Sequence, residues 1–242
     1  GILQPGGADT AGISSPLVDP GGLFVPIVGT ALCFIANPAA TPMPVSWDDL
    51  LRPDLKGKLQ YSTPGEAGGG TAMLLLLQHL LGKPGALDYL HRLQVNNVGP
   101  SASTAALQPK VDSGELLIAN GDVQMNAASI HNDGSRFTVF FPALQGTRTT
   151  ISMPYIAAVT ATSRRPEDAK RLLAHLLSDE AQRSVPTVAF GIPVRDRIAG
   201  ENATAAPDTP AGYLRGVTMW TPDWDAVLID LDRDLAAYKK AT

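Results

Sequence analysis

Three short segments of this 242-residue sequence place small and polar residues where helices are predicted to begin. They are residues 62–71, 99–104 and 120–122. The N–H groups of a helix's first turn have no partner inside the helix and carry partial positive charge, so they bind anions without lysine or arginine. Glycine lets a ligand approach the backbone, and serine and threonine add hydroxyl donors. The segments therefore predict an oxyanion site, and the alternative is that they are ordinary caps and turns.

Two carboxylates in these segments are candidates for contact with a ligand cation. Glu66 lies inside the glycine-rich segment, and Asp122 lies at a predicted helix start. An ammonium group that leaves water needs a partner charge, which either side chain could supply. The alternatives are that Asp122 is a routine helix cap and that Glu66 is simply exposed.

Motifs of other site chemistries are incomplete. Residues 65–70 have the glycine spacing of a nucleotide-binding P-loop, but Thr71 and Ala72 follow, without the lysine that reaches the phosphates. No G-x-S-x-G pattern of a serine hydrolase occurs. The four histidines are far apart in the sequence, and Cys33 has no second cysteine to pair with. We therefore expect no catalytic residue, no metal and no cofactor.

The composition narrows the function classes further. The sequence has 19 lysines and arginines against 23 aspartates and glutamates, a net charge of −4, which argues against nucleic acid as a partner. Hydrophobic residues make up 44% and charged residues 17%, so the chain should fold around a core. No apolar run reaches the roughly 18 residues of a membrane span.

Short strands alternate with helices along the chain, a pattern that is typical of α/β architecture. In an open α/β sheet such loops gather at the carboxyl ends of the strands. Ser46 and Asp49 predict a capping box, Gly82 and Pro84 separate two helices, and residues 199–210 form a surface loop or linker. Strands are expected within 23–36 (a buried pair), 58–62, 115–119, 137–142 and 151–160, and helices at 72–81, 85–94, 101–113, 123–130, 164–177, 180–185 and 223–239.

Several stretches of the sequence carry a family resemblance. The patterns are T-P-G-E-A-G-x-G-T-A at 63–72, N-N-V-G-P-S-x-S-T at 96–104 and A-N-x-D-x-Q-M at 119–125, with W-D-D-L-L before them. They resemble the periplasmic substrate-binding proteins of ABC importers, in particular the 2-aminoethylphosphonate-binding branch near the ferric-ion-binding type. The resemblance extends from about residue 23 to residue 197.

This resemblance implies an α/β fold of the type II periplasmic-binding-protein class, with the ligand between two lobes. Residues 1–40 would end the first lobe and cross over, 41–150 would form the complete second lobe, and 151–242 would return to the first lobe. The N-terminal part of the first lobe would be absent. The family further implies a periplasmic monomer that is no enzyme, binds a small aminophosphonate and docks on a membrane permease.

The resemblance also implies an anion site and its residues. Gly70 and Thr71 would meet the phosphonate at a helix start, and Ser101, Ser103 and Thr104 would complete the site.

The same resemblance implies contacts to the rest of the ligand. Asp122, with Gln124 nearby, or Glu66 would face the amine, and Tyr155 would close over the ligand from the other lobe.

Two other functions stay open at this point. A ferric-ion receptor needs neighbouring tyrosines to supply phenolate oxygens, and the five tyrosines here are widely spread in the sequence. A phosphoester or phosphonate hydrolase lacks any visible metal cluster or Ser–His pairing, although sequence separation does not decide spatial distance.

Overall fold

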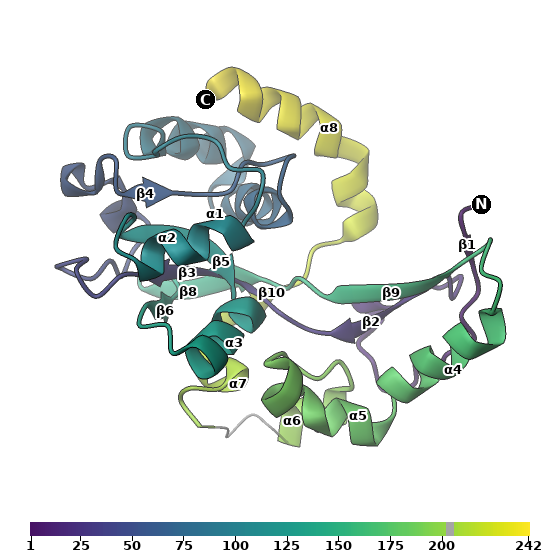
Figure 1. Cartoon of the computed structure of the whole chain (residues 1–242). Coiled ribbons are helices and arrows are strands. Elements are labelled where there is room, and N and C mark those ends of the chain that lie inside the picture. The colour runs from purple at the N-terminus through teal and green to yellow at the C-terminus, as the bar shows by residue number, and fades with distance from the viewer. Residues whose placement is uncertain (202–205) are drawn as a thin grey trace. The chain divides into compact units, whose positions relative to one another are not determined.

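The computed structural model describes residues 1–201 and 206–242, and the chain divides into two packing units (Figure 1). The first unit consists of Gly1–Thr30 and Met153–Arg215, and the second of Ala31–Ser152 and Gly216–Thr242. The chain therefore passes from one unit to the other three times. No helix in these described ranges is long and apolar enough to cross a membrane.

A four-stranded sheet forms the centre of the second unit. Its strand order is β4 (Leu59–Gln60), β5 (Ile118–Asp122), β3 (Leu32–Ala36) and β6 (Thr138–Phe140). β4 runs parallel to β5, whereas β3 is antiparallel to β5 and β6. Every residue of β3 and β5 is buried, as expected for strands that are covered on both faces.

The helices of the second unit cover this sheet because successive strand residues point to opposite faces. On one face Ile35 and Ala119 pack with residues of α2 (Gln108–Asp112) and with Phe137, and Ile130 of α3 (Val123–Asp133) packs against this cluster. The next residue, Phe34, contacts Trp47 edge-on at 5.4 Å between ring centroids.

The long element α1 (Gly68–Leu93) consists of two helices that meet at Gly82. Gly82 has φ 72° and ψ 163°, which no helix contains, and Pro84 starts the second piece. This break was predicted from the sequence, but the first helix begins at Gly68 rather than at residue 72. The capping box is also confirmed: Asp49 N–H donates to Ser46 Oγ (3.2 Å), and Ser46 N–H donates to Asp49 Oδ2 (2.9 Å).

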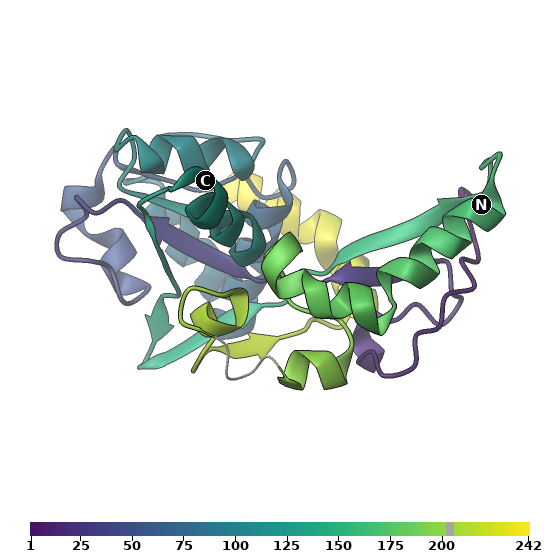
Figure 2. The same cartoon turned by 60° about the horizontal axis from the view of Figure 1, so that its bottom comes forward.

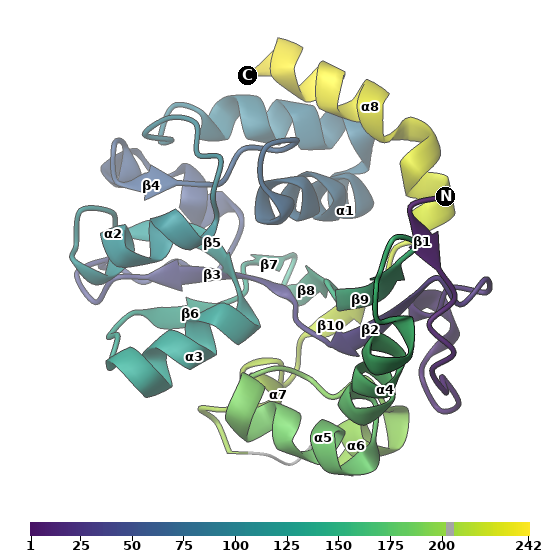
Figure 3. The ribbon, with the colours of Figure 1, turned by 45° about the vertical axis from the view of Figure 1, so that its right-hand side comes forward.

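The end of the chain packs with the second unit, where β10 (Thr218–Trp220) pairs in parallel with β8 (Thr147–Ile151), which pairs with β7 (Ala143–Leu144). The sequence had placed all of 151–242 with the first lobe. Residues 216–242 differ because α8 (Trp224–Ala241) lies beside α1 (Figure 3).

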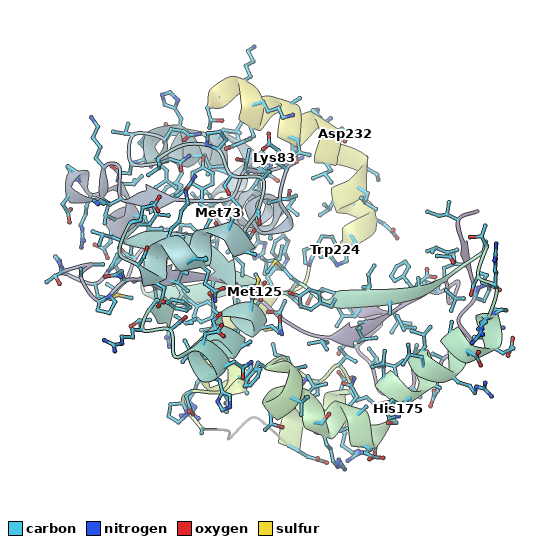
Figure 4. The ribbon with its side chains drawn as sticks, in the orientation of Figure 1. Met73, Lys83, Met125, His175, Trp224 and Asp232 are labelled. Atoms are coloured by element: carbon cyan, nitrogen blue, oxygen red, sulfur yellow. The ribbon has the colours of Figure 1, made fainter. Side chains whose placement is uncertain are left out.

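Lys83 is the main polar link between α8 and α1, and Figure 4 labels it beside α8. Its Nζ donates to Asp230 Oδ2 (2.7 Å) and Asp234 Oδ1 (2.9 Å), and these hydrogen bonds raise the pKa of Lys83. The hydroxyls of Tyr61 and Tyr238 lie 3.1 Å apart in the same contact.

The first unit contains an antiparallel sheet in the order β1 (Leu3–Gln4), β9 (Tyr155–Thr160) and β2 (Phe24–Val28). Figure 2 shows α4 running along this sheet. The core of the unit consists of Ile13, Val25, Val159, Leu173, Leu177 and Val194. Its helices are α4 (Pro166–Leu176), α5 (Asp179–Ser184), a π-helical turn (Val185–Ala189), α6 (Asp196–Glu201) and α7 (Pro210–Tyr213).

Three expectations from the sequence need correction. The strands predicted within 23–36 exist, but β2 and β3 belong to different units and pair with other strands. The strand predicted at 115–119 runs over Ile118–Asp122, so residues 120–122 are strand rather than loop. Of the loop predicted at 199–210, residues 199–201 are helical, 202–205 lie outside the described residues, and α7 begins at Pro210.

Candidate functional site

The carboxyl ends of β4 and β5 meet at one edge of the second unit's sheet because the two strands are parallel. Ser62 follows β4, and Asn120 lies in β5. Ser62 N–H donates to Asn120 Oδ1 (2.8 Å), and Asn120 Nδ2 donates to Ser62 Oγ (3.0 Å). Ser62 is 0% exposed and Asn120 1% exposed, so this pair is the buried base of the site.

Hydrogen bonds join the segment 99–104 to residues 60–63, and one of them reaches Ser62 of the base. Thr63 N–H donates to Ser101 O (2.8 Å), and Ser101 N–H donates to Thr63 Oγ1 (2.9 Å). Thr104 Oγ1 donates to Ser62 Oγ (2.9 Å), and Gln60 Nε2 donates to Gly99 O (3.1 Å). All three predicted segments therefore meet at Ser62, the third through Asn120, although they are far apart in the sequence.

The first turn of α1 enters this cluster without a side-chain cap. Its N-cap residue is Ala67, which has no cap hydrogen bond. The N–H groups of Gly68, Gly69 and Gly70 have no acceptor within residues 1–201 and 206–242. The helix start therefore presents three backbone donors with partial positive charge.

Close packing explains two of the glycines in this turn. A Cβ atom on Gly70 would lie 2.0 Å from Ser62 O, and one on Gly69 would lie 2.6 Å from Thr104 Oγ1. The sequence suggested that these glycines admit a ligand. The structure shows that Gly69 and Gly70 first of all let the helix approach Ser62 and Thr104.

The predicted hydroxyl residues of the anion site lie together, and most of their hydrogen bonds are internal. Thr71 Oγ1 accepts from Gly65 N–H (3.0 Å) and donates to Ala67 O (3.3 Å). Ser101 Oγ donates to Ser103 O (2.9 Å), and Ser103 Oγ accepts from Ala106 N–H (3.3 Å). Together with Gly70 and Thr104 these residues form one cluster, while their contacts with a ligand stay predictions.

The third predicted segment ends in an acidic residue that caps a helix. Asp122 is 8% exposed, and its Oδ1 accepts from Met125 N–H (2.8 Å) at the start of α3; Figure 4 labels Met125. The cap interpretation of Asp122 is thus confirmed. Gln124 lies in the first turn of α3. Burial, and then the charge of Asp122, raise the pKa of the neighbouring Cys33 thiol.

The two remaining predicted site residues are exposed. Glu66 lies in the turn before α1, where its N–H donates to Thr63 O (3.1 Å). Tyr155 belongs to the first unit and begins β9, with 43% of its surface exposed. Their predicted ligand contacts stay predictions. Among the described residues no group of three histidines, cysteines or acidic residues could hold a metal ion.

Ser62 and Asn120 begin two of the predicted segments, but neither was named as a site residue from the sequence. Their contact joins residues 58 positions apart, which no local pattern reports. The available signal was a polar side chain at the end of a buried strand, because such a group needs a partner.

Comparisons with known proteins agree with this fold. A family model described as "Bacterial extracellular solute-binding protein" matches residues 5–228. A protein of Salmonella typhimurium, named as a candidate 2-aminoethylphosphonate-binding periplasmic protein, is 40% identical over 244 residues, which cover 100% of this chain and 71% of that protein.

Solved structures show the same fold at lower identity. A periplasmic thiamin binding protein matches with a TM-score of 0.74 at 18% identity, covering 100% of this chain and 73% of that one. The apo ferric ion-binding protein A of Pasteurella haemolytica matches with a TM-score of 0.73 at 14% identity, covering 99% and 76%. The expected α/β periplasmic-binding-protein fold is therefore confirmed.

Proposed function

We propose a ligand and a partner for this chain, which belongs to the bacterial extracellular solute-binding proteins. The ligand is 2-aminoethylphosphonate or a similar small zwitterion with an oxyanion at one end. The protein acts in the periplasm as a monomer, carries out no reaction on the ligand, and delivers it to the permease of an ABC importer. The 40% identity to the Salmonella typhimurium protein supports this choice of ligand.

The observation that carries the proposal is the uncapped start of α1. The three free N–H groups belong to Gly68–Gly70 at the beginning of a 26-residue element, and Gly69 lies close to the side chain of Thr104. Backbone donors at a helix start hold phosphate-like groups through charge-assisted hydrogen bonds. Ser103, whose exposed hydroxyl accepts from Ala106 N–H, has its own proton left to donate.

The ammonium group of the ligand needs a negatively charged partner, which is Asp122 or Glu66 in this proposal. Asp122 is buried at the end of β5, so an ammonium group beside it would meet a charge in a region of low dielectric constant. Glu66 is exposed and lies directly before α1. We propose Asp122, with Gln124 in the next turn, as the first choice and Glu66 as the second.

Calorimetry with 2-aminoethylphosphonate tests the proposal directly. We expect saturable binding by the wild-type chain, and no heat up to millimolar ligand would refute it. Ser103→Ala should weaken binding by about 1–3 kcal/mol because a donor to a charged oxygen is lost. Ser113→Ala is the matched control, since Ser113 is an exposed serine of the same unit that donates to Lys110 O.

A second ligand identifies the residue that faces the amine. Ethylphosphonate has the phosphonate but no amine. Asp122→Asn should weaken the binding of 2-aminoethylphosphonate and leave that of ethylphosphonate unchanged, and Glu66→Gln should change neither. The reverse result would assign the amine to Glu66.

The ferric-ion alternative finds no support in the tyrosines of the second unit. Tyr61 and Tyr238 do come together, which the sequence did not predict, but both are buried. Burial and the hydrogen bond with Tyr238 raise the pKa of Tyr61 far above its usual range. A phenolate ligand for iron needs the opposite shift.

A further inference from the structure

A chain of hydrogen bonds leads from the sheet to the start of α1 through Asn120, Ser62 and Thr104. Asn120 contacts Ser62, and Ser62 contacts Thr104. We propose that this chain is a directed relay, in which Asn120 is a positioning residue that turns the Thr104 hydroxyl into a donor for the ligand's oxyanion. The inference rests on the proposed function and deepens it.

The orientation of the Asn120 amide is fixed by the backbone. Ser62 N–H donates at 2.8 Å, so the atom that it reaches must be the oxygen Oδ1. The amide nitrogen Nδ2 then faces Ser62 Oγ at 3.0 Å and can only donate to it. The first step of the relay therefore has one direction.

The second step passes this direction on to Thr104. Ser62 Oγ accepts from Asn120, and it has one proton of its own. Thr104 Oγ1 lies 2.9 Å away and donates to Ser62 in the structure, but two hydroxyls exchange donor and acceptor roles by rotation about their C–O bonds. With Asn120 donating from behind, Ser62 is polarised to donate towards Thr104.

The third step is the position of Thr104 beside Gly69, in the first turn of α1. Its Oγ1 lies 2.6 Å from the point that a Cβ atom on Gly69 would occupy. An oxyanion held by Gly68–Gly70 would therefore be close to Thr104. When the oxyanion arrives, Thr104 turns its proton to it and accepts the proton of Ser62 instead. Each hydrogen bond of the relay then polarises the following hydroxyl and strengthens its bond. No residue of the relay gains or loses a charge.

Asn120→Asp is the substitution that reverses the relay with little change of shape. The carboxylate would still accept from Ser62 N–H, but it would also accept the Ser62 hydroxyl proton. Ser62 would then be free to accept from Thr104, which would donate inwards and lose its proton for the ligand. The added negative charge would oppose the oxyanion as well, so the experiment must separate these two effects.

A double-mutant cycle with Thr104→Val makes that separation, measured as the dissociation constant of 2-aminoethylphosphonate by calorimetry on the 242-residue chain. We expect Asn120→Asp and Thr104→Val each to weaken binding by about tenfold or more. In the Thr104→Val background Asn120→Asp should weaken binding by a smaller factor than in the wild type, because only the effect of its charge remains once the hydroxyl is gone. Thr104→Ser should bind like the wild type.

Two controls keep the result decisive. Asn132→Asp adds the same charge at an exposed position of α3 and should leave the affinity unchanged. Unfolding curves of every variant report stability, and if Asn120→Asp does not fold, Ser62→Ala replaces it in the cycle.

Losses that multiply in the double variant, or wild-type affinity in Asn120→Asp, would overturn the relay alone. A wild-type chain that does not bind 2-aminoethylphosphonate would instead overturn the proposed function.

Discussion

The two packing units bury their sheets to different degrees. In the second unit β3 and β5 are buried along their whole length, with helices packed on both faces. In the first unit β9 is mostly exposed, and Ile156 shows 56% of its surface. The polar cluster at the start of α1 lies in the second unit, where the buried pair of Ser62 and Asn120 joins it to the sheet. The uncharged hydrogen-bond donors of the site are thus positioned by the unit whose sheet is more deeply buried.

The three tryptophans allow the two units to be followed separately. Trp47, Trp220 and Trp224 all belong to the second unit. Tryptophan fluorescence therefore reports the second unit, whereas circular dichroism reports the helices of both.

The largest effect is expected for Leu173→Ala in the first unit. Leu173 is 5% exposed, and all six members of its core cluster belong to that unit. The cavity should cost about 3 kcal/mol of unfolding free energy and lower the circular-dichroism transition. The tryptophan transition should stay in place. Leu172→Ala, at a neighbouring residue that is 57% exposed, is the control and should change neither signal. Equal shifts of both signals would show that the units unfold as one.

A smaller but more local effect is expected for Gly70→Ala in the second unit. The new Cβ atom would lie 2.0 Å from Ser62 O, so the helix start must move away from the sheet. We expect a loss of about 2 kcal/mol in the tryptophan transition. Gly68→Ala is the matched control, because its Cβ would meet nothing within 4 Å. Equal stability of the two variants would mean that the close approach of α1 is not needed.

The smallest effect concerns the capping box of the second unit. The hydrogen bond from Val45 N–H, followed by those from Ser46, holds the pKa of Asp49 below its usual value. A lowered pKa in the folded state contributes stability that is present at neutral pH and lost as the pH falls from about 5 to below 3. Asp49→Asn should cost about 1 kcal/mol at pH 7 and less at pH 3, measured by urea unfolding. Asp48→Asn, at an exposed neighbour, is the control and should leave the stability at pH 7 unchanged.

Most helices and strands were predicted because each depends on residues that are close in the sequence. The features that were missed depend on contacts between residues that are far apart in the sequence. The break at Gly82 and the capping box at Ser46 are visible in the sequence because each depends on a few adjacent residues. The pairing of strands was not visible. β2 and β3 follow each other in the sequence and pair in different units, and β10 pairs with β8 although residues 153–215 of the first unit lie between them in the sequence.

The prediction of the candidate site was limited in the same way. The hydroxyls of Ser101, Ser103 and Thr104 were found because a row of small polar residues precedes a helix. Ser62, the partner of Thr104, and its own partner Asn120 were not predicted as site residues, since a hydrogen bond between residues 58 positions apart depends on the parallel pairing of β4 and β5. Family resemblance added roles for individual residues, which binding measurements have to test.

The second unit is built from two stretches of sequence, which residues 153–215 of the first unit separate. β10 and α8 belong to the later stretch, so they are synthesised after residue 215. The α1 surface to which α8 binds therefore stays uncovered while residues 153–215 are made. During that time the nascent second unit exposes surface that the finished unit buries, which favours aggregation.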